Sequence, residues 1–319
     1  MISETANTTA IGEALNLPPG MQFIQRGWLN SNLILIGGDR PIVIDTGHEV
    51  DAEATVALLS QLGVDPTQIG LIGVTHCHWD HHGGNARLHA LSGAPVAMGQ
   101  RTADLFRAQD RHLMWMSYFG QEATLVQPEV VWQVGATVTL NGWPFEVWEA
   151  GGHAPDGIAL YQPEYKALIC GDALLEGDFG IMNVAVHGWE TVLDSAESTL
   201  RRFLKREIAV ALPGHGPAVT AVHGNAQILL KRLAQFRRSP ARLARHLCRR
   251  VFMVYLMTMT PINRTALIDY VRVFPWVNDY LPMLGSQDYA ATLNGLLDEY
   301  IAGGLAEERD GVLYSLLAR

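Results

Sequence analysis

The chain has 319 residues, 48% of them hydrophobic, which is enough for one large and one small domain with buried cores. Its net charge of −9 argues against a protein whose whole surface attracts nucleic acid. The three cysteines, Cys77, Cys170 and Cys248, are odd in number and far apart, so no disulfide scaffold is expected. No run of about 18 uncharged apolar residues is present, and residues 1–19 lack the basic start and apolar core of a signal peptide. We therefore expect a cytoplasmic protein that does not cross a membrane.

Short apolar runs alternate with helical patterns through the first two-thirds of the chain. Residues 33–36, 42–44 and 71–74 are predicted strands, and residues 51–62 are a predicted helix. The alternation continues to about residue 217, which indicates an α/β fold built in layers.

A group of histidines with one aspartate follows the predicted strand at residues 71–74. His76 and His78 are two apart in extended chain, so their side chains point the same way and can bind one metal ion. Asp80 and His81 come where the chain turns at two glycines, which places them to reach a second ion. Four such residues at a strand end are difficult to explain without a metal.

Three more candidate ligands each follow a short apolar strand and lie beside glycine. They are His153 after residues 145–148, Asp172 after residues 167–169, and His215 after residues 208–212. Glycine lets the backbone turn sharply and approach a ligand closely. Each residue alone is a weak signal, but with the first group they predict a metal centre.

Residues 20–220 resemble the metallo-β-lactamase superfamily and contain all five of its motifs, the earliest at residues 42–47. There Asp45 resembles the family's aspartate that supports the metal ligands. The resemblance implies an αββα sandwich with two metals at one edge between the sheets. It implies that His76, His78 and His153 hold the first metal, that Asp80, His81 and His215 hold the second, and that Asp172 bridges them. This set resembles that of glyoxalase II, and superfamily enzymes with a cysteine ligand place it where Asp172 stands.

The implied cofactors are two divalent metal ions. Nitrogen and oxygen ligands suit zinc, with iron or manganese as alternatives. Two ions about 3.5–4 Å apart can share a water and lower its pKa toward about 7, which gives hydroxide at neutral pH. The catalytic residues would be Asp172 as the bridge and Asp80, which can also shuttle a proton.

Two segments are candidates for the wall of a substrate pocket. Residues 111–119 are rich in methionine and aromatic residues, which favours core packing over an apolar lid above the metals. Residues 176–189 follow Asp172 and include His187, for which a structural role is favoured over substrate contact.

A small helical domain at residues 223–319 is predicted to follow a catalytic domain at residues 1–222. Its predicted elements are a helix from Ser239 and Pro240 to Pro261, helices at residues 264–273 and 289–301, and a hairpin at residues 303–314 with an Asp-Gly turn. Three helices and a hairpin are typical of a winged-helix-like unit. Members of the lactamase-like-2 group within the superfamily, which this chain resembles, carry such an extension.

Positive charge gathers at residues 201–250. Twelve of the 23 lysines and arginines lie there with Glu207 as the one acidic residue, so the segment carries +11 and the remaining chain −20. The predicted helix that would enter a DNA groove has no lysine or arginine, so nucleic acid is not an expected partner. The basic segment is interpreted as a solvated face, a phosphate-neutralising surface for a substrate such as an acyl-CoA, or one side of a domain or homodimer interface.

Three function classes compete. The leading one is a metal-dependent hydrolase of a small carbonyl substrate, either a thioester, an ester or a lactone. The basic segment keeps a nuclease or phosphodiesterase open, although residues 173–213 are too short for the inserted domain of relatives that cut long RNA. A di-iron redox enzyme normally has acidic substitutions among the histidines and a flavin domain, which this sequence lacks. β-Lactam hydrolysis is disfavoured because it usually belongs to secreted enzymes.

Overall fold

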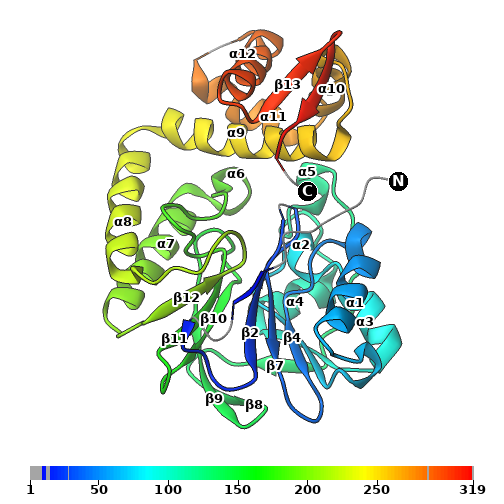
Figure 1. The fold of residues 1–319 in the computed structure, drawn as a ribbon. Coiled ribbons are helices and arrows are strands. Elements are labelled where there is room, and N and C mark those ends of the chain that lie inside the picture. The colour runs from blue at the N-terminus through cyan, green and yellow to red at the C-terminus, as the bar shows by residue number, and fades with distance from the viewer. Residues whose placement is uncertain (1–8, 12–14, 28, 286, 318–319) are drawn as a thin grey trace.

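The structure, a computed structural model, describes residues 9–11, 15–27, 29–285 and 287–317 (Figure 1). The prediction that residues 1–19 are not a signal peptide falls partly outside the described residues, because residues 1–8 and 12–14 are not among them. Within the described part of the chain, no helix is long and apolar enough to span a bilayer.

Two β-sheets form the centre of the molecule (Figure 1). The first contains β1 (Thr9–Ile11), β2 (Met21–Gln25), β3 (Leu33–Ile36), β4 (Ile42–Ile44), β5 (Leu71–Val74), β6 (Val96–Gly99) and β7 (Val130–Trp132), in that order. The second contains β12 (Val210–Pro213), β11 (Ala167–Gly171), β10 (Ile158–Gln162), β9 (Trp143–Glu149) and β8 (Thr137–Leu140), in that order. The strands predicted at residues 33–36, 42–44 and 71–74 are confirmed with the same bounds.

Strands within the two sheets, such as β3, β10 and β11, are buried on both faces because both faces are covered. Successive side chains of a strand point to opposite faces. Ile34 and Ile36 of β3 therefore pack between the two sheets, whereas Leu35 packs under the outer helices. In β10, Leu160 likewise faces the first sheet and Tyr161 faces outward. Strands buried on both faces appear in the sequence as continuous apolar runs, which explains why they could be predicted.

Helices cover the outer faces of the sheets and complete the predicted αββα sandwich (Figure 1). On the first sheet lie α1 (Ala52–Gln61), α3 (Asn85–Ser92) and α4 (Gln100–Ala108), and on the second lie α7 (Trp189–Leu204) and α8 (Val222–Arg238). Short helices occur at α2 (Trp79–His82), α5 (Met116–Phe119) and α6 (Val184–His187), and 3₁₀ turns at Glu49–Asp51, Pro66–Gln68 and Pro282–Leu284. The predicted helix at residues 51–62 is α1, preceded by the first of these turns.

The C-terminal part is helical and ends in a hairpin. It contains α9 (Pro240–Met259), α10 (Arg264–Val271), α11 (Pro275–Tyr280), α12 (Tyr289–Ala302), β13 (Ala306–Arg309) and β14 (Val312–Ser315). Asp310 and Gly311 have φ angles of 51° and 77°, as a tight two-residue turn requires. Helix α11 was not predicted, because a six-residue helix is too short to show a helical repeat.

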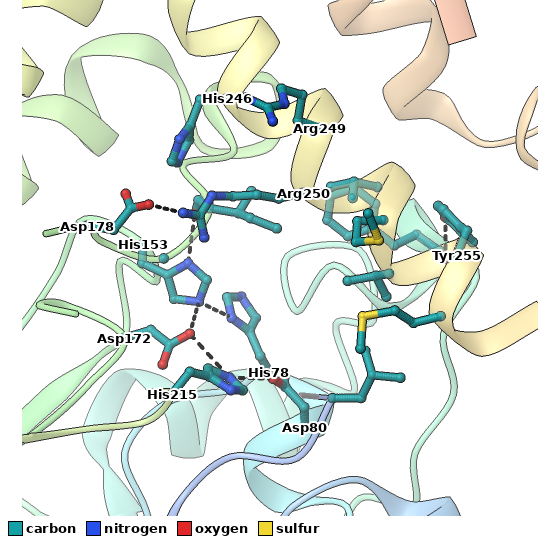
Figure 2. Close-up of a pocket in the computed structure, with 18 of the residues that line it drawn as sticks. His78, Asp80, His153, Asp172, Asp178, His215, His246, Arg249, Arg250 and Tyr255 are labelled. Carbon is teal, nitrogen blue, oxygen red and sulfur yellow. Dashed lines mark hydrogen bonds and ion pairs between the residues drawn. The ribbon is translucent and has the colours of Figure 1, made fainter. Parts of the chain in front are cut away.

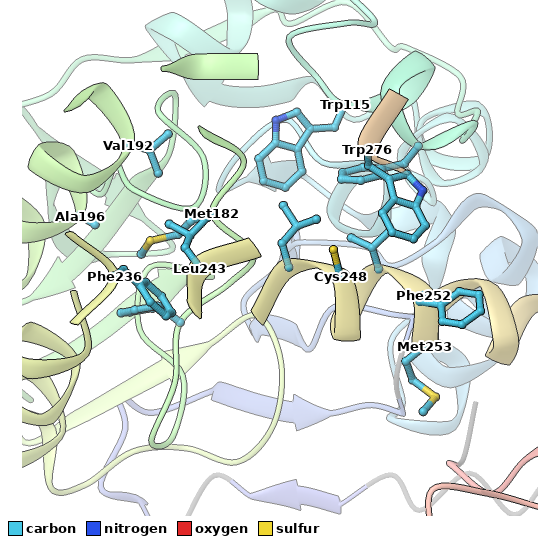
Figure 3. Packing of buried hydrophobic residues seen from close by; sticks show 14 of the residues in the cluster. Trp115, Met182, Val192, Ala196, Phe236, Leu243, Cys248, Phe252, Met253 and Trp276 are labelled. Atoms are coloured by element: carbon cyan, nitrogen blue, oxygen red, sulfur yellow. The ribbon is translucent and has the colours of Figure 1, made fainter. Parts of the chain in front are cut away.

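Helix α9 lies across the end of the sandwich and joins it to the C-terminal elements (Figure 1). Its buried side chains pack between Phe236 of α8 and Trp276 of α11 (Figure 3). The same apolar cluster reaches Trp115 on one side and Leu313 of the hairpin on the other. The division of the chain at residues 222 and 223 into two domains stays a prediction.

Candidate metal centre

All seven predicted ligands come together at one edge of the sandwich, and Figure 2 shows five of them. His76 and His78 follow β5, Asp80 and His81 lie in α2, and His153, Asp172 and His215 follow β9, β11 and β12. Strands β9, β11 and β12 run in the same direction, so the loops after them meet at one edge of the second sheet. The Ile158 N–H donates to the Thr75 carbonyl at 3.0 Å, which joins that edge to the end of β5 in the first sheet.

His76, His78 and His153 form one group whose potential ligand atoms all lie within 4.8 Å of one another. His78 Nδ1 is 2.7 Å from His153 Nε2. His153 Nδ1 lies 2.6 Å from the Ile181 carbonyl, which can only accept a hydrogen bond. The proton of His153 is therefore on Nδ1, and Nε2 faces the group with its lone pair.

Asp80, His81 and His215 form a second group within the same 4.8 Å limit. His215 Nε2 is 3.0 Å from Asp80 Oδ2, and His81 Nδ1 is 2.8 Å from Asp45 Oδ2. Asp45 also accepts hydrogen bonds from the backbone N–H and the hydroxyl of Thr75. Asp45 thus orients His81 from outside the group, the arrangement by which carboxylates commonly support metal-binding histidines.

The carboxylate of Asp172 faces both groups. Its Oδ1 is 3.6 Å from His81 Nε2, and its Oδ2 is 3.5 Å from His153 Nε2 and 3.6 Å from His215 Nε2. A carboxylate so placed is able to bridge two cations held by the two groups. The role of each of the seven side chains as a ligand stays a prediction.

Two glycines allow this close approach. A Cβ on Gly214 would lie 2.3 Å from Asp172 Oδ1, and a Cβ on Gly180 would lie 2.3 Å from His153 Nδ1. Real Cβ atoms essentially never come so close to a neighbour. Any other residue at either position would therefore displace a candidate ligand.

Within the described part of the chain, four buried polar atoms of the candidate ligands make no hydrogen bond: Nε2 of His76, His78 and His81, and Oδ1 of Asp172. Polar atoms buried without a partner are costly and are rare in native proteins. Imidazole nitrogens and carboxylate oxygens converging in this way are the ligands that zinc and similar divalent ions prefer. The residues therefore fit the metal ions that the sequence implied.

The protonation states of His76 and Asp172 suit a metal centre, whereas His81 and His215, whose pKa values the facing carboxylates raise despite burial, must release a proton to bind a metal. Burial lowers the pKa of His76 well below its usual value, and the neighbouring His81 and His153 lower it further, so this imidazole is neutral. Burial raises the pKa of Asp172, but the facing His215 and His81 outweigh burial and hold that pKa well below the ordinary value. A neutral imidazole and an ionised carboxylate are the forms that bind cations.

A cavity of about 580 Å³ opens above the centre. His78, Asp80, His153, Asp172 and His215 line its floor. The aromatic residues Trp79, Trp115 and Phe119 also line the cavity. Residues of α9 line it too, and Figure 2 labels Arg250 and Tyr255 among them. The candidate ligands are thus accessible to a molecule that occupies this cavity.

The segment at residues 111–119 supplies both core and wall. Met114 and Met116 are fully buried, as core packing predicts, whereas Trp115 also lines the cavity. The ring of Trp115 lies over His78 with centroids 4.0 Å apart. Its indole N–H donates to His187 Nε2 at 2.8 Å. Among the described residues that line the cavity His187 does not occur, so its contact with Trp115 supports the structural role.

The sequence showed a basic segment and left open whether it is a solvated face, a phosphate-neutralising surface or an interface; the structure brings part of it to the cavity. Five arginines line the cavity, namely Arg232, Arg242, Arg245, Arg249 and Arg250. Asp178 pairs with Arg232 at 2.6 Å and with Arg250. The sequence showed the charge of this segment, and the helical spacing of its arginines was visible. That this face turns toward the metal centre depends on how α9 packs.

Residues 26–215 match the model of the metallo-beta-lactamase superfamily. The chain belongs to this superfamily. The solved structure of a metallo-beta-lactamase family protein from Thermus thermophilus aligns with 93% of this chain and 99% of the Thermus chain, with 20% identity and a TM-score of 0.57. This likeness shows a shared fold that includes the C-terminal region.

Curated relatives match the superfamily part of the chain at low identity. A hydroxyacylglutathione hydrolase from Haemophilus influenzae is 26% identical over 194 residues, which are 60% of this chain and 87% of the relative. A beta-lactamase-like protein 2 homolog from Caenorhabditis elegans is 26% identical over 216 residues, 67% of this chain and 63% of the relative. An acyl-coenzyme A thioesterase from Gallus gallus is 26% identical over 180 residues, 50% of this chain and 65% of the relative. The predicted resemblance to glyoxalase II and to the lactamase-like-2 group is confirmed, and the chain is a metallo-hydrolase of this superfamily.

Proposed function

We propose that the protein hydrolyses a small carbonyl substrate, with a thioester ahead of an ester or lactone, at a centre of two divalent metal ions. The observation that carries this proposal is the Asp172 carboxylate, which faces both histidine groups at the floor of a largely apolar cavity. His76, His78 and His153 would hold one ion, and Asp80, His81 and His215 the other. Zinc is proposed before iron or manganese, although all three suit these ligands.

Two divalent ions held by these residues would supply the chemistry of the reaction, a hydroxide available at neutral pH for hydrolysis of a carbonyl compound. The residues of the chain position this chemistry. Asp45 and the Ile181 carbonyl fix the rings of His81 and His153. Asp80 lines the cavity and remains 20% exposed; although burial raises its pKa, His81 and His215 outweigh burial and hold that pKa well below the ordinary value, so Asp80 stays ionised and suits the role of a ligand. Trp115 and Phe119 exclude water from one side of the substrate.

The cavity favours an acyl substrate over a polymer. Valine, methionine, leucine and aromatic side chains form much of its wall, and such walls bind apolar groups. Two of the relatives are named for acting on an acyl-coenzyme A and on a hydroxyacylglutathione, both acyl conjugates of a thiol. These names support the choice of a thioester over an ester or a lactone in this proposal. A homodimer and a cytoplasmic location stay predictions.

The test is hydrolysis of a thioester, a lactone, a phosphodiester and a β-lactam by metal-loaded protein. His78→Ala should lose at least about 100-fold in kcat/KM for the preferred substrate, because it removes one candidate ligand. His223→Ala is the matched control, since His223 is exposed on α8 and bonds the Arg206 carbonyl away from the cavity. Unchanged turnover by His78→Ala would refute the site. Turnover of the phosphodiester alone would move the protein to the nuclease alternative.

A further inference from the structure

We propose that the first half of α9 binds a phosphate-bearing part of the substrate's thiol, while the second half binds its acyl group. This inference rests on the proposed thioester hydrolysis and adds the substrate class. It assigns a function to the basic segment, for which the sequence left three interpretations open.

The cavity-facing side of α9 changes character along the helix. In its first half the residues that line the cavity are Arg242, Arg245, His246, Arg249 and Arg250, and in its second half they are Val251, Met253, Val254, Tyr255 and Met257. Leu305 and Leu317 extend the apolar end of the cavity. Figure 2 shows His246 and Arg250 above His153, and Tyr255 further along the same helix. A ligand that lies along α9 therefore meets a basic end and an apolar end, with the metal centre below.

The basic end has more positive charge than its own acidic partners neutralise. Asp178 pairs with both Arg232 and Arg250, and Glu299 of α12 lies 2.6 Å from Arg245 and 3.7 Å from Arg249. Arg242 donates to the neutral amide of Gln235 at 3.2 Å. Five guanidinium groups thus face two carboxylates. An excess of three charges suits a ligand with several negative charges, such as a phosphate or diphosphate, better than a single carboxylate.

The exposure of these side chains favours a ligand. Arg242, Arg245 and Arg249 are exposed at the mouth of the cavity and can rearrange toward an incoming anion. The guanidinium group presents paired donors that match phosphate oxygens, so it binds phosphate with two parallel hydrogen bonds. Arg250 is half-buried and forms an ion pair with Asp178, which neutralises its charge. The three exposed arginines are therefore the proposed phosphate ligands.

His246 lines the same end of the cavity and has a buried polar atom. Its Nε2 is buried and makes no hydrogen bond to any residue that the structure describes, and its ring packs against Phe179 and Phe236. Burial, reinforced by Arg232 and Arg249, lowers the pKa of His246 to about 4, so the ring is neutral at neutral pH. A neutral imidazole can still donate one hydrogen bond to a ligand. His246 Nε2 thus lies among three exposed arginines without a hydrogen-bond partner among the described residues. A bound phosphate group would supply the missing hydrogen bond and counter the positive charge.

Two thiols that form thioesters also carry a phosphate group: coenzyme A, and phosphopantetheine on a carrier protein. Glutathione has carboxylates and no phosphate, so the proposal separates the substrate from a glutathione thioester. Substrates for the test share one acyl group on N-acetylcysteamine, pantetheine, glutathione, 4′-phosphopantetheine, coenzyme A and a carrier protein. The N-acetylcysteamine and pantetheine thioesters have no phosphate, so their hydrolysis measures the reaction without any contribution from the phosphate-binding arginines.

The test variant combines Arg242→Gln, Arg245→Gln and Arg249→Gln. Its matched control combines Arg107→Gln, Arg238→Gln and Arg272→Gln, which remove the same charge from exposed arginines outside the cavity. We expect the wild type to prefer the phosphate-bearing thioesters over the pantetheine thioester at least tenfold in kcat/KM. The test variant should lose this preference through a higher KM for the phosphate-bearing thioesters, and the control should behave as wild type.

Binding of desulfo-coenzyme A to metal-free protein, measured by calorimetry, gives a readout that needs no turnover. Binding of desulfo-coenzyme A should be at least tenfold weaker in the test variant than in the wild type and unchanged in the control variant. If no thioester is hydrolysed but this dependence is seen, the proposed function fails and the phosphate subsite stands. Equal kcat/KM for the pantetheine and phosphate-bearing thioesters in the wild type would overturn the inference while thioester hydrolysis stands. Preference for the carrier protein with the same arginine dependence would uphold the subsite and identify the source, and tighter arginine-dependent binding of an RNA oligonucleotide would overturn it.

Discussion

The substitution Gly180→Ala should damage the metal centre without disturbing the fold. Gly180 does not have a left-handed backbone, so alanine can adopt its conformation. The added Cβ would lie 2.3 Å from Nδ1 and 2.4 Å from Cγ of His153. Ordinary van der Waals contact begins at 3.4 Å, so the ring or the loop must move by about 1 Å.

Such a movement is large for a metal site. Ligand distances are held to within about 0.2 Å, and a displacement of about 1 Å in a catalytic group can cost about 100-fold in rate. His153 would also lose its 2.6 Å contact with the Ile181 carbonyl, which fixes its ring. We expect zinc affinity to fall at least about tenfold and kcat/KM about 100-fold.

Competition with a chromophoric chelator measures the affinity of Gly180→Ala, and thermal unfolding of the metal-free protein tests its fold. Gly224→Ala is the matched control, because a Cβ on Gly224 in α8 meets nothing within 4 Å. Wild-type zinc affinity in a folded Gly180→Ala variant would refute the assignment of His153 as a ligand.

Three further substitutions test other parts of the structure. Asp45→Asn should reduce metal affinity about 10–100-fold in chelator competition, because it removes the charged acceptor that orients His81; unchanged affinity would contradict that role. Asp178→Asn should lower the free energy of unfolding by about 2 kcal/mol in urea titration, because it leaves the half-buried Arg250 without its counter-charge; a loss below about 0.5 kcal/mol would show that the pair contributes little. His246 has a pKa of about 4 when folded and about 6.5 when unfolded, so the unfolded state binds more protons between these values and stability falls as the pH drops from 6.5 to 4. Between pH 6.5 and 4, the free energy of unfolding should therefore fall by about 3 kcal/mol less in His246→Asn than in the wild type, as measured by denaturant titrations. Identical pH profiles of stability for the two proteins would contradict the burial of a neutral ring.

The parts of the fold that the sequence predicted are those that depend on local patterns. Strands such as β3 and β5 are short apolar runs bounded by turn residues, so their bounds matched. The candidate ligands could be found because each lies at a strand end beside a glycine. For Gly214 the structure gives the reason, since any side chain there would meet Asp172.

The parts that the sequence missed depend on contacts between distant segments. Asp178 and Arg250 are 72 residues apart, and nothing local in either segment indicates that they pair. The cavity wall requires α9 to lie across the end of the sandwich, which its packing against Phe236 and Trp276 determines. A helical pattern shows that α9 has a basic face but does not show what that face meets.

The central claim is that His76, His78, Asp80, His81, His153, Asp172 and His215 hold two metal ions. Metal content per chain, measured by mass spectrometry on purified protein reconstituted with zinc, tests it most directly, with Asp172→Ala beside the wild type. We predict close to two ions per wild-type chain and a clear loss in the variant, which lacks the bridging carboxylate. A wild-type protein that holds no metal after reconstitution with zinc, iron or manganese would contradict the account.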